Sequence, residues 1–148
     1  DDTIARMVDT GTFLVSTSAL TENWDISDQP KPLQAKAAEI FPKARESLSK
    51  AIEAGVKIAL GTDAPAIWHA RNAEELEVLV SRGMSPLQAT RAATTVGAEL
   101  VDTPELGRIA AGMRAESIGV AGDPLEDIAA VRQVSCVIKD GEVHKNLT

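Results

Sequence analysis

The carboxylate best placed for chemistry in this sequence is Asp63, in the run Gly61-Thr62-Asp63-Ala64-Pro65. It follows an almost wholly apolar stretch, residues 56–60, that predicts a buried strand. In α/β folds, ligands bind where the carboxyl ends of parallel strands meet. A carboxylate there can bind a divalent metal or take a proton from an activated water. The alternative is a turn Asp that hydrogen-bonds within its own loop.

Two histidines add to the candidates, but neither lies in a metal-binding motif. His69 follows in the loop after Asp63, where it either contacts a substrate or is an ordinary loop residue. His144 is expected to be an exposed strand residue near the C-terminus. The sequence lacks His-x-His, His-Glu-x-x-His and Cys-x-x-Cys, so no complete metal site of familiar spacing is present. It also lacks glycine-rich phosphate loops and a Gly-x-Ser-x-Gly nucleophile elbow.

The residues before Asp63 predict one strand–helix–strand unit. Residues 12–18 predict a buried strand, and residues 33–54 show a single helical stripe that Pro42 should kink or split. A continuous apolar strand after such a helix is typical of a parallel sheet. A short helix over residues 3–10 is expected before this unit, and residues 21–32, rich in Asn, Asp and Pro, predict a loop.

Two helices are predicted after Asp63, and β structure follows them. Asn72, with Glu75 three residues later, resembles a capping box that begins a helix over residues 73–82. Ser85-Pro86-Leu87-Gln88 is a stronger start for a helix that runs to about Val101. From residue 102, short β-like runs follow, including Gly107-Arg108-Ile109 and a hairpin that turns at Asp140-Gly141. We therefore expect an α/β part over residues 1–101 and a small β part over residues 102–148.

Composition limits the classes of function. The chain has 148 residues, a formal charge of −7 and 44% hydrophobic residues, which is typical of a globular domain. The negative charge argues against nucleic acid and anionic membranes as partners. No secretory signal or membrane-spanning run is visible. The single Cys136 excludes an intrachain disulfide and favours a reducing, cytoplasmic location. The start at Asp1-Asp2, without Met, indicates a processed or cut end.

An ordered series of segments resembles the C-terminal part of the metal-dependent amidohydrolases. The nearest group is the imidazolonepropionase-like branch, which includes Xaa-Pro dipeptidase-type members. Residues 11–17 resemble strand 7 of that family's barrel, and residues 53–63 resemble strand 8. His69-Ala70-Arg71-Asn72-Ala73-Glu74-Glu75-Leu76 resembles the His-Gly-x-Asn-Ala-x-Glu-Leu loop of this branch. The other matching segments are residues 83–89, 91–94, 106–112, 122–128 and 137–143.

The resemblance implies an α/β fold: the last part of a (β/α)₈ barrel, with strands 7 and 8 and their helices over residues 1–101, and part of a small β-sandwich over residues 102–148. Members bind one or two divalent metals, of which Zn is expected here, and hydrolyse amide-type C–N bonds. Asp63 matches the strand 8 ligand that also acts as acid and base on the attacking water. The loop with His69 and Asn72 matches a region that contacts the substrate.

This sequence also departs from the family pattern. Strands 1 to 6 and every histidine ligand are missing, and a complete barrel needs about 250 residues. Ala70 replaces the loop Gly, Ser16 stands where Pro is common, and Ala115-Glu116-Ser117 replaces Ala-Asp-Leu. One carboxylate cannot hold a catalytic metal alone, so we expect the isolated chain to bind none and to be inactive.

Three interpretations remain open at this point. In the first, the chain is the C-terminal portion of an amidohydrolase that acts on a small amide or dipeptide and needs the remaining barrel chain. In the second, it is a non-catalytic α/β domain that associates with itself or with a partner through open sheet edges. In the third, it is an independent binding module that uses the loop from Asp63 to His69.

Overall fold

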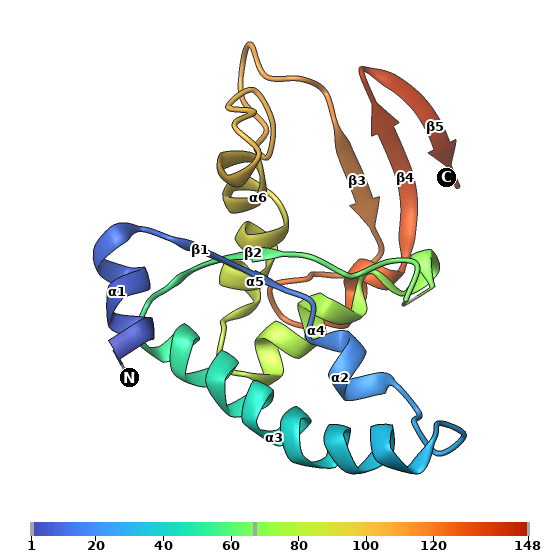
Figure 1. Cartoon of the computed structure of the whole chain (residues 1–148). Helices are drawn as coiled ribbons and strands as arrows, with labels where there is room; N and C mark the ends of the chain where they lie inside the picture. The colour runs from blue at the N-terminus through green and yellow to red at the C-terminus, as the bar shows by residue number, and fades with distance from the viewer. Residues whose placement is uncertain (1, 67, 148) are drawn as a thin grey trace.

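The computed structural model describes residues 2–66 and 68–147, and it confirms the strand–helix–strand unit. Strands β1 (Phe13–Ser16) and β2 (Lys57–Leu60) pair in parallel, with Leu14 opposite Ile58 and Ser16 opposite Leu60. Helix α3 (Lys31–Glu53) joins them, and α1 (Asp2–Thr10) precedes β1 (Figure 1). The carboxyl ends of both strands therefore lie at one edge of the pair.

The main core lies where β2 meets three helices. Ile58 of β2 packs with Leu48 of α3, Leu79 of α4 (Glu74–Ser81) and Ala89 of α5 (Pro86–Ala93). Ala side chains let the helices approach closely, which suits a chain with only 3% aromatic residues. Helix α3 runs through Pro42 without being split, so the predicted interruption is not a break in the helix.

The predicted loop over residues 21–32 was partly wrong, because a short helix, α2 (Ala19–Asn23), occupies its start. Ser18 precedes α2 but makes no side-chain cap. Instead, the backbone N–H groups of Ser18 and Ala19 donate to the carboxylate of Glu75, which projects from α4. A residue far away in the sequence thus satisfies the first donors of α2, and local patterning could not reveal it.

The predicted capping box at Asn72 was also wrong. Asn72 ends a single 3₁₀ turn, η1 (His69–Arg71), and α4 begins after Ala73 without a side-chain cap. Glu75 would have to fold back on its own helix to complete the box, but its carboxylate bonds to β1 and α2 instead. The hydrogen bonds that Glu75 accepts from residues distant in the sequence therefore replace the local capping bond to Asn72.

The second predicted start is confirmed, but the helix that follows is broken. Ser85 and Gln88 form a reciprocal capping box at the start of α5. The predicted single helix to about residue 101 is instead α5 and α6 (Thr95–Leu100), separated at Thr94, which has φ −125° and ψ −90°. Gly107 approaches this break so closely that an added Cβ would lie 2.7 Å from the Thr94 carbonyl oxygen.

The C-terminal residues form a second sheet. Its order is β3 (Ser117–Val120), β4 (Val134–Lys139) and β5 (Glu142–Asn146), all antiparallel, and a 3₁₀ segment, η2 (Ile128–Arg132), precedes β4. The predicted hairpin is confirmed, with positive φ at Asp140 and Gly141. The β-like run at residues 107–109 forms no strand.

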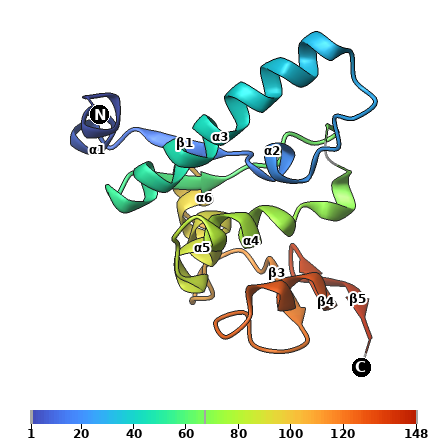
Figure 2. The ribbon, with the colours of Figure 1, turned by 90° about the horizontal axis from the view of Figure 1, so that it is seen from below.

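Figure 2 places this sheet on the side of the molecule opposite α3. The side chain of Arg132 in η2 forms a bidentate ion pair with Glu77 of α4, which connects the C-terminal segment to the helices. The division at residue 102 stays a prediction. Among the described residues, no helix is both long and apolar enough to cross a membrane.

Candidate functional site

Asp63 lies at the expected edge, in the loop after β2. Its backbone has φ +53°, and its carbonyl oxygen accepts the N–H of Ala66 at 2.8 Å. The side chain is exposed. Within residues 2–66 and 68–147, its carboxylate has no hydrogen bond or ion pair, so the local bonds expected of a turn-capping Asp are not formed there. The carboxylate is thus free to bind a ligand.

A backbone hydrogen bond at Gly61 holds the loop that carries Asp63 against β1. The N–H of Gly61 donates to the carbonyl oxygen of Ser16 at 2.7 Å. An added Cβ on Gly61 would lie 2.8 Å from Cγ1 of Val15 and 3.1 Å from Cγ2 of Thr17. Only a residue without a side chain fits this approach, so the sequence requires Gly two residues before Asp63.

His69 and Asn72 line one hollow of the structure, and Asp63 does not. Both are exposed, and the hollow, of about 210 Å³, is also lined by residues of η1, α4 and η2. Two of the three candidate residues therefore line the same hollow, and Asp63 lies earlier in the same connection between β2 and α4.

The described residues do not form a metal site by themselves. No group of three or more His, Cys, Asp or Glu side chains comes together in the part of the chain that the structure describes. Protein sites hold Zn²⁺ with three or four such ligands. Within the described residues, Asp63 therefore belongs to no such group of ligands.

The sequence analysis missed Glu75 as a residue of this region. Its side chain is 0% exposed, and its carboxylate accepts hydrogen bonds from Ser16 Oγ at 2.5 Å, the Ser18 N–H at 3.0 Å and the Ala19 N–H at 2.6 Å. Burial raises the pKa of Glu75, although these hydrogen bonds oppose the rise. One signal could have found it, because Glu75 shares a helix face with the buried Val78 and Leu79.

A charged cluster surrounds the next carboxylate, Glu74. Arg71 donates to both of its oxygens, at 2.6 and 2.8 Å, and Asn23 donates at 2.6 Å. The hydrogen bond from Arg71 is the main reason that the pKa of Glu74 lies below its usual value. This pair holds η1, and with it the backbone next to His69, against the start of α4.

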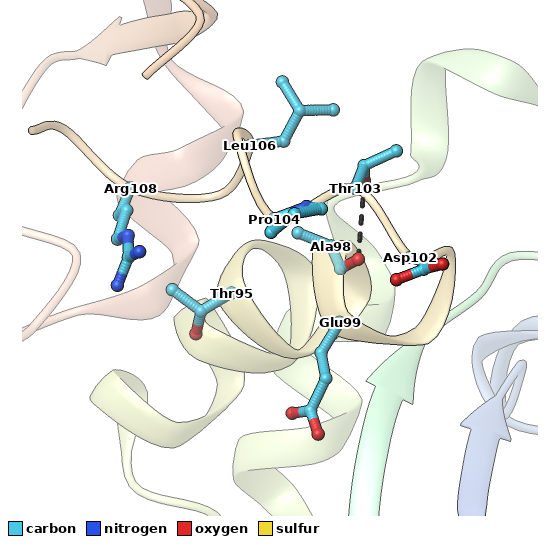
Figure 3. A pocket seen from close by; sticks show the side chains of 8 residues that line it. All are labelled: Thr95, Ala98, Glu99, Asp102, Thr103, Pro104, Leu106 and Arg108. Carbon is cyan, nitrogen blue, oxygen red and sulfur yellow. Dashed lines mark hydrogen bonds between the residues drawn. The ribbon is translucent and has the colours of Figure 1, made fainter. Parts of the chain in front are cut away.

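Asp63 lines neither of two further hollows. One, of about 260 Å³, lies beside α6, where Thr103 Oγ1 donates to the Ala98 carbonyl oxygen at 3.4 Å (Figure 3). Its lining contains none of the candidate residues. The other, of about 580 Å³, separates the helices from β3, and its lining is mainly apolar. Leu60, Leu76, Ile109 and Ile118 are among the side chains that line it.

Two relatives, one of them matched both in sequence and in structure, show where this arrangement belongs. The chain is 34% identical over 152 residues to ochratoxinase of Aspergillus niger, a match that covers 94% of this chain and 30% of ochratoxinase. It superposes on a Xaa-Pro dipeptidase with methionine bound in its active site, with a TM-score of 0.91, 35% identity, and coverage of 98% of this chain and 37% of that one. The A. niger ochratoxinase structure gives a TM-score of 0.86 at 33% identity, over 99% of this chain and 35% of that one.

These matches cover nearly all of the described α/β fold. The chain spans about a third of the length of the relatives it matches, so its elements correspond to one portion of a larger fold. A model of the amidohydrolase family also matches residues 1–144. The chain belongs to the amidohydrolase family.

Proposed function

We propose that this chain is the C-terminal portion of a metal-dependent hydrolase that cleaves an amide-type C–N bond. The observation that carries the proposal is the free carboxylate of Asp63, which follows β2 at the carboxyl edge of the parallel pair. In barrel enzymes the catalytic groups lie at that edge. Family membership supports the assignment of β1 and β2 as strands 7 and 8 of the barrel, and of residues 102–148 as part of the small β-sandwich.

Asp63 is proposed to be both a metal ligand and an acid–base group. A bound divalent metal, of which Zn²⁺ is the expected ion, would polarise the carbonyl and lower the pKa of water. Asp63 would accept the proton of the attacking water and pass it to the departing nitrogen. His69 and Asn72 are proposed to contact the substrate from the neighbouring hollow.

The substrate is proposed to be a small amide or dipeptide. The solved relatives include the Xaa-Pro dipeptidase and a prolidase complexed with N-methylphosphonate-L-proline. The second of these is 34% identical and has a TM-score of 0.83. Their similarity extends through nearly all of this chain, which supports a shared class of reaction.

The partner is proposed to be the portion of the barrel that the relatives have and this chain does not match. The apolar hollow between α4, α5 and β3 offers a surface for it, because Ile109 is 95% exposed and Ile118 is 57% exposed there. Exposed apolar patches of this kind mark interaction sites. The same exposure favours a second candidate, a non-catalytic domain that associates with a copy of itself.

A reconstitution experiment separates the two candidates. The chain is expressed with a polypeptide that carries the part of A. niger ochratoxinase that it does not match, and Zn²⁺ and a dipeptide series are added. We expect a one-to-one complex that hydrolyses an amide bond, whereas the chain alone is inactive. A complex should not form with Ile109→Asp, but should form with Leu125→Asp, which alters an exposed side chain outside the hollow.

Substitution of Asp63 then tests its role in that complex. Asp63→Asn should lower kcat by about a thousandfold or more, because the amide cannot carry the proton or the metal-binding charge. Asp102→Asn is a matched control, since Asp102 is also exposed and also has φ +53°. Equal activity of Asp63→Asn and wild type would refute the proposed role. A stable homodimer that forms no complex would favour the second candidate.

A further inference from the structure

Glu75 joins three segments that meet next to the candidate site. It projects from α4 and accepts hydrogen bonds from the side chain of Ser16 and from the backbone N–H groups of Ser18 and Ala19. Ser16 is itself 3% exposed, so this bond is sealed from water. Three donors that share one buried carboxylate hold the end of β1 and the start of α2 in one geometry.

Ser16 continues this connection to the loop of Asp63. While its side chain donates to Glu75, its carbonyl oxygen accepts the N–H of Gly61 at 2.7 Å. Gly61 has no room to move toward β1, since even a Cβ would lie 2.8 Å from Val15. The position of Ser16 therefore determines where the loop with Asp63 begins.

Asp63 depends on this connection because little else holds its side chain. In the described part of the chain its carboxylate has no partner, and its own loop is closed by a backbone bond between Ala66 and Asp63. The backbone at Asp63 determines which rotamers its unbonded side chain can adopt. A group that fixes the backbone at Gly61 therefore limits the directions in which Asp63 can point.

The geometry points to Glu75 as a positioning residue for Asp63, acting from α4 through Ser16 and Gly61. Its importance for catalysis rests on the function proposed above for Asp63, but the positioning itself can be measured without metal or substrate. A buried carboxylate that merely stabilised the fold would affect all elements alike. A positioning residue affects the Gly61–Ala66 loop first.

Amide hydrogen exchange in the full 148-residue chain tests this inference. Glu75→Gln replaces one carboxylate oxygen with a side-chain NH₂ group. That NH₂ would face the backbone N–H of Ala19, so the hydrogen bond from Ala19 is lost and two donors meet. We expect the amides of Gly61 and Ala66 to exchange about tenfold faster, since weakening a buried bond by about 1.4 kcal/mol changes a local equilibrium tenfold. The amide of Ala89, bonded within α5, should change by less than about twofold.

Two variants serve as controls. Glu74→Gln alters the neighbouring carboxylate, which bonds to Arg71 and Asn23 and to none of the donors of Glu75. It should leave the exchange of Gly61 unchanged. Ser16→Ala removes the hydroxyl that donates to Glu75 and also lies 3.2 Å from Ser18 Oγ. It should accelerate exchange at Gly61 as Glu75→Gln does, so the test remains decisive if Glu75→Gln does not fold.

Three results would overturn the inference. They are unchanged exchange at Gly61 in both variants, equal acceleration of Gly61 and Ala89, and an identical effect of Glu74→Gln. In an active complex, Glu75→Gln should lower kcat with little change in KM. If activity were lost in Asp63→Asn and kept in Glu75→Gln, the proposed function would stand and the positioning role would fail. If exchange at Gly61 changed in Glu75→Gln but the complex hydrolysed no amide bond, the positioning role would stand and the proposed function would fail.

Discussion

Replacing Gly61 with Ala tests the close approach between the end of β1 and the loop of Asp63. The added Cβ would lie 2.8 Å from Cγ1 of Val15 and 3.1 Å from Cγ2 of Thr17, closer than carbon atoms normally pack. Both neighbours are β-branched and have restricted χ1 angles, so they cannot easily turn away. Because Gly61 is not among the glycines with positive φ, the cost of Ala here is steric rather than conformational.

The expected loss of stability follows from two opposing effects. Overpacking of this kind costs about 1–3 kcal/mol. Ala also lowers the entropy of the unfolded chain, which stabilises the fold by about 0.4–1 kcal/mol. With each effect at the middle of its range, the net destabilisation of Gly61→Ala should be about 1.3 kcal/mol, or a Tm lower by about 3–5 °C for a chain of this size.

Urea unfolding, followed by far-UV circular dichroism, measures this effect in a double-mutant cycle with Val15→Ala. Val15 is 47% exposed, so its truncation alone should cost little, and it removes the nearest clashing carbon. In that background Gly61→Ala should cost about 1 kcal/mol less. Gly97→Ala in α6 is the control, since its Cβ would lie at an ordinary 3.5 Å from the carbonyl oxygen of Ala92 in α5, and it should stabilise the chain. An unchanged cost in the Val15→Ala background would refute the steric explanation.

Three other substitutions and one metal analysis have expected outcomes of their own. Leu79→Ala should lower the free energy of unfolding by about 2–5 kcal/mol, because Leu79 is 0% exposed in the core; a smaller loss in urea unfolding would mean that the site collapses around the gap. Burial raises the pKa of Glu75 above 4.5, so the stability that Glu75 contributes is lost as the pH rises through that raised pKa. In Glu75→Gln, the free energy of unfolding, measured with urea across this pH range, should no longer show that decline. The hydrogen bond from Arg71 lowers the pKa of Glu74 below 4.5, so the stability that Glu74 contributes is lost as the pH falls. Arg71→Ala should therefore reduce the loss of stability at low pH, but not the loss that Glu75 causes as the pH rises. Elemental analysis after desalting should find less than about one tenth of an equivalent of Zn²⁺ on the isolated chain, because Zn²⁺ needs more than one ligand. One tightly bound equivalent would contradict the inference that the chain alone supplies too few ligands.

The parts of the fold that the sequence predicted correctly depend on neighbouring residues. The Asp140-Gly141 turn needs two positive φ values, which these residue types tolerate, and the Ser85–Gln88 capping box closes within one helical turn. The parallel pair was predicted from a local pattern, because β2 is apolar after Lys57 and follows a helix. The turn and the capping box form within their own segments, whereas the strand pair joins segments on either side of α3.

The errors come from contacts between segments that are distant in the sequence. α2 was expected to be a loop because the carboxylate that bonds its first N–H groups belongs to Glu75 in α4. For the same reason Glu75 could not complete a capping box with Asn72. The helix expected to run to residue 101 breaks at Thr94, against which Gly107 packs. Of the candidate site, the location of Asp63 at the strand edge was predictable, whereas its separation from the hollow of His69 and Asn72 was not.

The parallel pairing of β1 with β2 also affects how fast the chain folds. Phe13 meets Lys57 only after a loop that contains the whole of α3 has closed, and such closure loses chain entropy before any strand contact repays it. Helix α3 can form early, because its hydrogen bonds are local. The strands should therefore join late in refolding. Until then Leu14 and Ile58 are exposed to solvent, and the refolding yield should fall as the protein concentration rises.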